Sequence, residues 1–190
     1  MVRTPKEILK VDTMPDEIWK GMLSMVHESL PSCDYYIATP DRGFAEDGGS
    51  RMFHWLRDSY GYDIQEISDP RILEDQQIIK FSVYHPNACE ELCAPVFTPA
   101  WKDKVTLVSA GKEWMDATLQ GSGKGPALDF LQKHLGIAPD ETCAFGDNIN
   151  DIEMSVKQVI ATRFQTPVRK SRLLPKIPAH PTGKTEYCRF

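Results

Sequence analysis

The sequence of 190 residues lacks long apolar runs, internal repeats and paired cysteines. No stretch approaches the length of a membrane span or of a secretory signal, so we expect a cytoplasmic protein with no membrane partner. The five cysteines are odd in number and have no paired spacing, which predicts reduced thiols. With 41% hydrophobic and 26% charged residues, the chain can form one sizeable domain or two small ones.

The cysteines raise one metal alternative. His85, Cys89 and Cys93 are spaced by four, so a helix would place three soft ligands on one face. Pro86 falls early in this segment, and a fourth ligand is not evident. Because cysteine is often a small buried apolar residue, we favour packing over a zinc site here.

The strongest chemical signal is Gly-Asp-Asn-Ile-Asn-Asp at 146–151, directly after the apolar run 143–145. Asp147 would lie at the carboxyl end of a buried strand, where ligands bind in open α/β sheets. Asp151 would follow one helical turn later on the same side. Such a pair suits Mg²⁺, which combines a few carboxylates with water and substrate phosphate oxygens. A plain helix start is the alternative, since Asp is favoured at an N-cap and in the first turn.

Lys124 lies in the glycine-rich segment 121–126, ahead of apolar residues at helical spacing. Pro126 is well placed as the first helical residue. We therefore expect Lys124 just before a helix N-terminus, where free amides and a lysine charge favour a phosphoryl group. A solvated loop lysine is the alternative.

Two familiar motifs are excluded at these positions. A Walker A loop would need glycine where Thr118 stands and Ser or Thr where Gly125 stands. An EF-hand would need glycine where Ile152 stands. The nucleotide-loop and calcium-loop interpretations are therefore rejected.

Together these residues resemble the third and fourth motifs of haloacid dehalogenase-like (HAD) hydrolases, in the Cof-type sugar-phosphatase branch. The resemblance rests on Gly-Lys-Gly-x-Ala-Leu from Gly123, a helix ending in Leu135-Gly136-Ile137, and Cys-Ala-Phe-Gly-Asp-Asn-x-Asn-Asp-x-x-Met from Cys143. It implies an α/β fold in which the C-terminal part of a HAD-like Rossmannoid core is preceded by an α/β cap domain.

The resemblance divides the chain into three parts. Residues 1–116 would form the cap that selects the substrate, 117–162 the C-terminal part of the core, and 163–190 an atypical tail. Within the cap, apolar spacing predicts helices at 15–30 and 52–60 and a strand at 35–38. The resemblance implies further cap strands at 78–84, 105–109 and 114–117. The stretch 41–49 is interpreted first as a turn and second as a specificity loop.

The resemblance also implies a reaction, the Mg²⁺-dependent hydrolysis of a small phosphate monoester through an aspartyl-phosphate. Lys124 would balance charge on the phosphoryl group and the nucleophile. Asn150 would hydrogen-bond near the phosphate, and Asp147 and Asp151 would hold the metal. The partner would be a small phosphorylated metabolite such as a sugar phosphate.

The family's first motif, Asp-x-Asp-x-Thr after an apolar strand, is not found. Asp12 has Met14 where the second Asp belongs, and Asp41 and Asp47 sit in a polar loop. By the resemblance, this motif and the Ser/Thr motif precede the cap, so we expect a truncated, incomplete or inactive form. A non-catalytic binding or regulatory fragment is the alternative, and a non-functional product is a third.

The tail at 163–190 differs in charge from the rest. It has seven basic residues and one acidic residue, a net of +6, whereas the preceding part has a net of −11. Four prolines break any continuous helix there. Clustered positive charge would suit nucleic acid, but we favour a segment foreign to the family, for instance through a reading-frame change.

Overall fold

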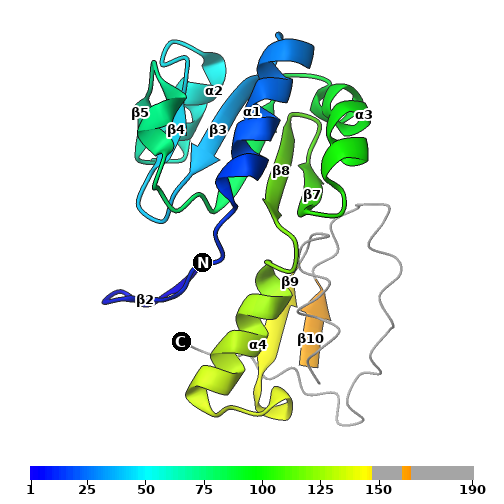
Figure 1. Ribbon diagram of the computed structural model, residues 1–190. Helices are drawn as coiled ribbons and strands as arrows, with labels where there is room; N and C mark the ends of the chain where they lie inside the picture. Colours follow the sequence, from blue (N-terminus) through cyan, green and yellow to red (C-terminus); the bar gives the residue numbers. More distant parts are fainter. Residues whose placement is uncertain (147–159, 164–190) are drawn as a thin grey trace. The chain divides into compact units, whose positions relative to one another are not determined.

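The computed structural model describes residues 1–146 and 160–163 and divides into two compact units, Met1–Gly123 and Lys124–Phe190 (Figure 1). The first unit contains a six-stranded sheet in the order β5-β4-β3-β6-β8-β7. Its strands are as follows: β3 (Asp34–Ala38), β4 (Gly43–Ala45), β5 (Ile64–Glu66), β6 (Lys80–Tyr84), β7 (Val105–Ala110) and β8 (Trp114–Leu119). A short antiparallel pair, β1 (Val2–Arg3) and β2 (Ile8–Lys10), precedes the sheet.

Only β4 and β5 pair in parallel; the other neighbouring strands of the sheet are antiparallel. The β7–β8 hairpin turns at Gly111, whose φ of +70° is readily adopted by glycine. Side chains alternate between the two faces of the sheet. In β3, for example, Tyr35 and Ile37 belong to one core cluster, and Tyr36 and Ala38 belong to the other.

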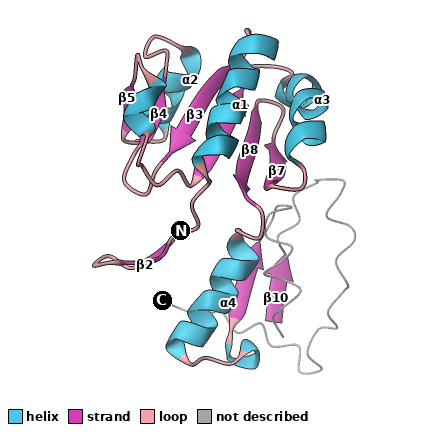
Figure 2. Cartoon of the chain, in the orientation of Figure 1, coloured by secondary structure: helices cyan, strands magenta, loops and turns pink. Residues whose placement is uncertain are grey.

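Helices α1 (Asp16–Ser29) and α3 (Cys89–Trp101) pack against the first face of this sheet (Figure 2). Their largest fully buried side chains include Trp19, Met22 and Phe97. The second face carries the smaller cluster, to which α2 (Arg51–His54) and the π-helical turn η1 (Trp55–Ser59) contribute. A 3-10 turn, η2 (Pro70–Leu73), follows β5.

The two predicted cap helices and four predicted cap strands are confirmed, with shifts of their ends. Trp19 is 1% exposed and Trp55 packs on Tyr84 and Trp114, so both tryptophans are packing residues. Helix α3 was not predicted as an element, because Pro95 and Pro99 lie inside it and proline usually interrupts helices.

The interpretation of 41–49 as a turn is wrong for its centre, since Gly43–Ala45 is strand β4 and all three residues are buried. Strand β5 was not predicted either. A strand of three residues is too short to show period-two alternation, and its neighbours in the sheet, not its own pattern, hold it in place.

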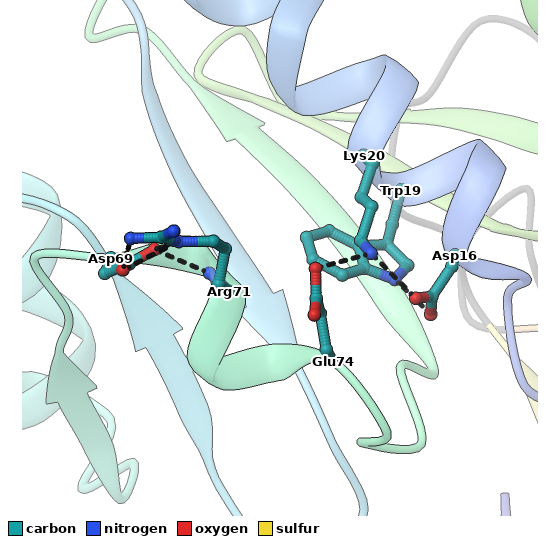
Figure 3. A network of polar contacts seen from close by, with 6 residues as sticks. All are labelled: Asp16, Trp19, Lys20, Asp69, Arg71 and Glu74. Atoms are coloured by element: carbon teal, nitrogen blue, oxygen red, sulfur yellow. Dashed lines mark hydrogen bonds and ion pairs between the residues drawn. The ribbon is translucent and has the colours of Figure 1, made fainter.

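Exposed polar contacts join α1 to the segment after η2 (Figure 3). The Lys20 amino group lies 2.9 Å from Asp16 Oδ2 and 2.9 Å from Glu74 Oε1, and Trp19 Nε1 donates to Asp16 Oδ1 at 3.1 Å. Such exposed pairs orient a segment more than they stabilise the fold. Nearby, the Arg71 side chain and backbone N–H hold the pKa of Asp69 at about 2.

The described part of the second unit consists of α4 (Lys124–Leu135), the 3-10 turn η3 (Pro139–Glu141) and the parallel strands β9 (Cys143–Gly146) and β10 (Ile160–Arg163). Gln132 Nε2 donates to Thr142 Oγ1 at 2.9 Å and so links α4 to the start of β9. The described residues thus form an α/β fold, as predicted. None of the described helices is both long and apolar enough to cross a membrane.

Burial differs sharply between the units. The first unit has large side chains with no exposed surface, whereas Leu135 of α4 is 61% exposed and Leu128 and Leu131 are half-buried. Backbone hydrogen bonds that are covered by a packed core open rarely. We expect slow amide hydrogen exchange in β6 and β8 and fast exchange in β9, measured by mass spectrometry on the whole chain. Equal protection of β8 and β9 would contradict this expectation.

Candidate functional site

Lys124 is the first residue of α4 and follows a tight turn that leaves β8. Gly121 has a φ of +78°, and Ser122 donates to the Leu119 carbonyl from both its backbone N–H, at 3.0 Å, and its Oγ, at 2.6 Å. Pro126 was expected to be the first helical residue, but α4 begins two residues earlier, at Lys124. Proline is tolerated throughout a first turn, because the first amides have no partner within the helix.

The electrostatics of this helix end suit an anion. Lys124 is exposed at the amino end of a helix of 12 residues, where the helix dipole adds partial positive charge. Lys133 and His134 lie in the last turn, where a basic side chain complements the opposite end of the dipole. The end of α4 at Lys124 therefore presents positive charge to solvent.

Strand β9 directly precedes the predicted metal-site residues in the sequence. It pairs in parallel with β10, with Cys143 opposite Ile160 and Gly146 opposite Arg163. Gly146, its last residue, directly precedes Asp147 in the sequence. Asp147, Asn150 and Asp151 lie outside the described residues. Their roles therefore stay predictions, and Lys124 is the one predicted site residue that the structure describes.

The three residues considered for zinc do not form such a site. Cys89 and Cys93 are fully buried in the first core cluster, while His85 Nδ1 accepts the backbone N–H of Ala88 at 3.1 Å. Among residues 1–146 and 160–163, no group of three or more His, Cys, Asp or Glu side chains is arranged to hold a metal ion.

A polar cluster on the second face of the sheet was missed by sequence reasoning. Ser82 Oγ donates to Asp116 Oδ1 at 2.6 Å, and Lys80 Nζ lies 3.4 Å from the same oxygen and 5.6 Å from the centre of the Tyr36 ring. Burial, together with negative charge from Tyr62 and Asp116, raises the pKa of Tyr36 to about 12. No local sequence pattern predicts this cluster, because only the strand register brings Tyr36, Ser82 and Asp116 together.

A pocket of about 300 Å³ lies at the end of the same sheet where β3 begins. Three carboxylates line it, those of Asp34, Glu46 and Asp47, and none of its lining residues is Lys or Arg. His27 Nε2 lies 2.9 Å from Glu46 Oε2. Burial, and then the charge of Asp47, raise the pKa of Asp34.

Comparison with solved structures identifies the fold. A crystal structure from Eubacterium rectale is 55% identical, with a TM-score of 0.79 over 85% of this chain and 61% of that one. The structure of the HAD subclass IIB sugar phosphatase BT4131 is 18% identical, with a TM-score of 0.66 over 80% of this chain and 56% of that one. The chain therefore spans less than two thirds of each of these proteins.

Two further proteins match shorter stretches. The HMP-PP phosphatase of Serratia proteamaculans is 43% identical over 51 residues, which are 27% of this chain and 19% of that protein. The chloroplastic endoribonuclease YBEY of Arabidopsis thaliana is 38% identical over 60 residues, or 32% of this chain and 10% of that protein. Because so little of the endoribonuclease is covered, this match says nothing of nuclease chemistry.

The sequence profile of the haloacid dehalogenase-like hydrolases matches residues 2–157, which include Lys124 and the segment that follows β9. The match covers nearly all of the first unit and about half of the second, and the solved structures share the fold. By this match, the chain belongs to the haloacid dehalogenase-like hydrolase family.

Proposed function

We propose that this chain acts in the Mg²⁺-dependent hydrolysis of a small phosphate monoester, such as a sugar phosphate, as in the Cof-type branch of the family. One observation carries the proposal: Lys124 opens α4 in the same unit as the strand that leads into Asp147. In this scheme residues 1–116 act as the substrate-selecting cap and 117–162 as part of the catalytic core. Reduced thiols and the absence of a long apolar run support a cytoplasmic location.

The residues of this chain would bind and orient the phosphoryl group. The Lys124 ammonium and the free amides of the first turn of α4 would offset charge on the phosphoryl oxygens and on the nucleophile. Asn150 would donate an amide N–H close to the phosphate. Asp147 and Asp151 supply carboxylate oxygens, the donor type that Mg²⁺ prefers, and the bound ion would neutralise charge on the phosphoryl group.

The nucleophile of the proposed reaction is not among these residues. In the printed sequence no aspartate is followed two positions later by a second aspartate. The carboxylate that attacks phosphorus would therefore come from a segment outside the 190 residues or from another chain. The lack of this aspartate pair also favours a second candidate function, in which the cap binds a ligand without catalysis.

We therefore expect the purified chain with Mg²⁺ to hydrolyse an aryl phosphate no faster than its Lys124→Ala variant. Positioning and charge stabilisation act on a phosphoryl transfer only when a nucleophile is in place. The measurement is the release of the aryl alcohol, and Lys133→Ala, on the same helix, is the matched control. A magnesium-dependent turnover that is lost in Lys124→Ala alone would show that these residues contain a substitute nucleophile.

A further inference from the structure

The pocket beside β3 has three carboxylates in its lining that take no part in the proposed reaction. Asp34 opens β3, and Glu46 and Asp47 directly follow β4. The lining has neither Lys nor Arg, and its basic side chain is that of His27, which lies next to Glu46. The lining therefore carries more negative than positive charge and disfavours an anionic ligand.

The C-terminal end of α1 forms another side of the pocket. Val26 and His27, from the last turn of the helix, and Leu30, its C-cap, all line the cavity. The helix dipole places partial negative charge at this end and favours a cation there. The dipole and the carboxylates therefore favour the same charge in the pocket.

A buried hydroxyl in the same lining has no partner. Tyr35 lines the pocket and is 3% exposed, and its hydroxyl makes no hydrogen bond with any part of the chain that the structure describes. The Tyr35 ring lies edge-to-face with that of His27, with 5.9 Å between the centroids, so it shares a wall with the His27–Glu46 pair. An unpaired buried hydroxyl is costly, and its oxygen can accept a hydrogen bond. A ligand that brings an N–H donor into the pocket would satisfy it.

The arrangement of these groups favours an organic cation over a metal ion. Within the described ranges, no three His, Cys, Asp or Glu side chains are arranged to hold a metal, so the three carboxylates of the pocket do not converge on one point. The cavity of about 300 Å³ also has apolar walls, to which Val26, Leu30 and Met52 contribute. Separate carboxylates around an apolar wall match an aliphatic chain that carries an ammonium group at each end.

We propose that this pocket binds a small aliphatic diamine in its doubly protonated form. The ammonium groups pair with the carboxylates of Asp34, Glu46 and Asp47, and the Tyr35 hydroxyl accepts one N–H. The methylene chain lies against the apolar wall. The site is built from the first unit alone and does not depend on the proposed phosphatase reaction.

The first experiment titrates the full chain with 1,4-diaminobutane by isothermal titration calorimetry in a low-salt buffer. We expect saturable binding of one diamine per chain, and no binding of the neutral 1,4-butanediol or of the dianion succinate. Equal binding of the diol, or displacement of the diamine by Mg²⁺ at matched ionic strength, overturns the proposal.

Two variants test the residues of the site. Glu46→Gln should weaken diamine binding about tenfold, as expected for the loss of a hydrogen bond to a charged group. Glu28→Gln is the matched control and should bind as the wild type does, since Glu28 is exposed in the last turn of α1 and does not line the pocket. Equal weakening in the two variants would show a general charge effect and no site.

The Tyr35→Phe variant removes only the unpaired hydroxyl. It should weaken diamine binding about fivefold, and the melting temperature of the unliganded chain should stay the same or rise, because the hydroxyl has no partner to lose. Wild-type affinity in this variant overturns the role given to the hydroxyl.

The second experiment locates the bound diamine on the wild-type chain. Cys33 is half-buried and lines the pocket, whereas Cys143 of β9 is exposed and serves as an internal reference. Saturating 1,4-diaminobutane should slow the alkylation of Cys33 by iodoacetamide about fivefold, because access falls with the fraction of empty sites, and should not change the rate at Cys143. Binding without protection of Cys33 would place the diamine elsewhere and overturn the proposal.

Discussion

Phosphatase activity should appear when the chain is joined to segments that supply an Asp-x-Asp-x-Thr motif and a Ser/Thr motif. The Eubacterium rectale protein is the natural donor, because it is 55% identical and this chain covers 61% of it. Segments that carry the two motifs would be placed before Met1, and a family-like end would replace the residues after Thr162. In that fusion, Asp147→Asn should lower kcat by about two orders of magnitude or more, as expected for the loss of one main electrostatic stabiliser.

The reason lies in the chemistry of phosphoryl transfer, which depends on positioning and on charge neutralisation. A carboxylate-to-amide change removes a charged metal ligand while it keeps the size of the side chain. The measurement is steady-state phosphate release from a panel of sugar phosphates at varied Mg²⁺ concentration. Asp140→Asn is the matched control, since Asp140 lies in η3 of the same unit and is exposed.

Two outcomes would contradict the proposed function. If the fusion folds, binds Mg²⁺ and hydrolyses none of the substrates, the binding role becomes the better interpretation. If Asp147→Asn and Asp140→Asn lower kcat equally, Asp147 has no special part in metal binding.

The second large effect concerns the stability of the first unit. Phe97→Ala should lower its free energy of unfolding by about 3 to 5 kcal/mol, because deletion of a buried aromatic ring removes its transfer free energy and leaves a cavity. Phe97 has no exposed surface and belongs to the larger core cluster between α1, α3 and the sheet. Urea denaturation followed by tryptophan fluorescence gives the change from the midpoint and slope.

The control for this variant lies on the same helix. Leu92 is 36% exposed, so Leu92→Ala removes a side chain that water already reaches, and the loss should be well below that of Phe97→Ala. Similar losses in the two variants would mean that α3 does not pack against the sheet through Phe97.

Much of the first unit could be predicted from residue order because its elements carry periodic patterns. Buried side chains of α1 recur at Ile18, Met22 and Val26, one helical turn apart, and the pattern alone predicts the helix. By contrast, α3 was not predicted, because Pro95 and Pro99 lie within it. The helix forms because its buried residues pack against the sheet. Tertiary packing outweighs the local cost of proline there.

The polar residues of this protein also differ in whether a local sequence pattern reveals them. Lys124 could be found from sequence, because a glycine-rich turn followed by helical apolar spacing is a local pattern. The cluster of Lys80, Ser82 and Asp116 has no such pattern. These side chains come from distant segments, and strand register or helix packing brings them together.

The sequence by itself determined the α/β class, the family resemblance and the motif residues, since each depends on neighbours within a few positions. Only the tertiary structure decided the strand order, the Lys80–Ser82–Asp116 cluster and the acidic pocket. The physical reason is that strands pair their backbone hydrogen bonds, and the sheet and α3 bury their apolar faces, against partners far along the chain. No local sequence pattern records which partners those are.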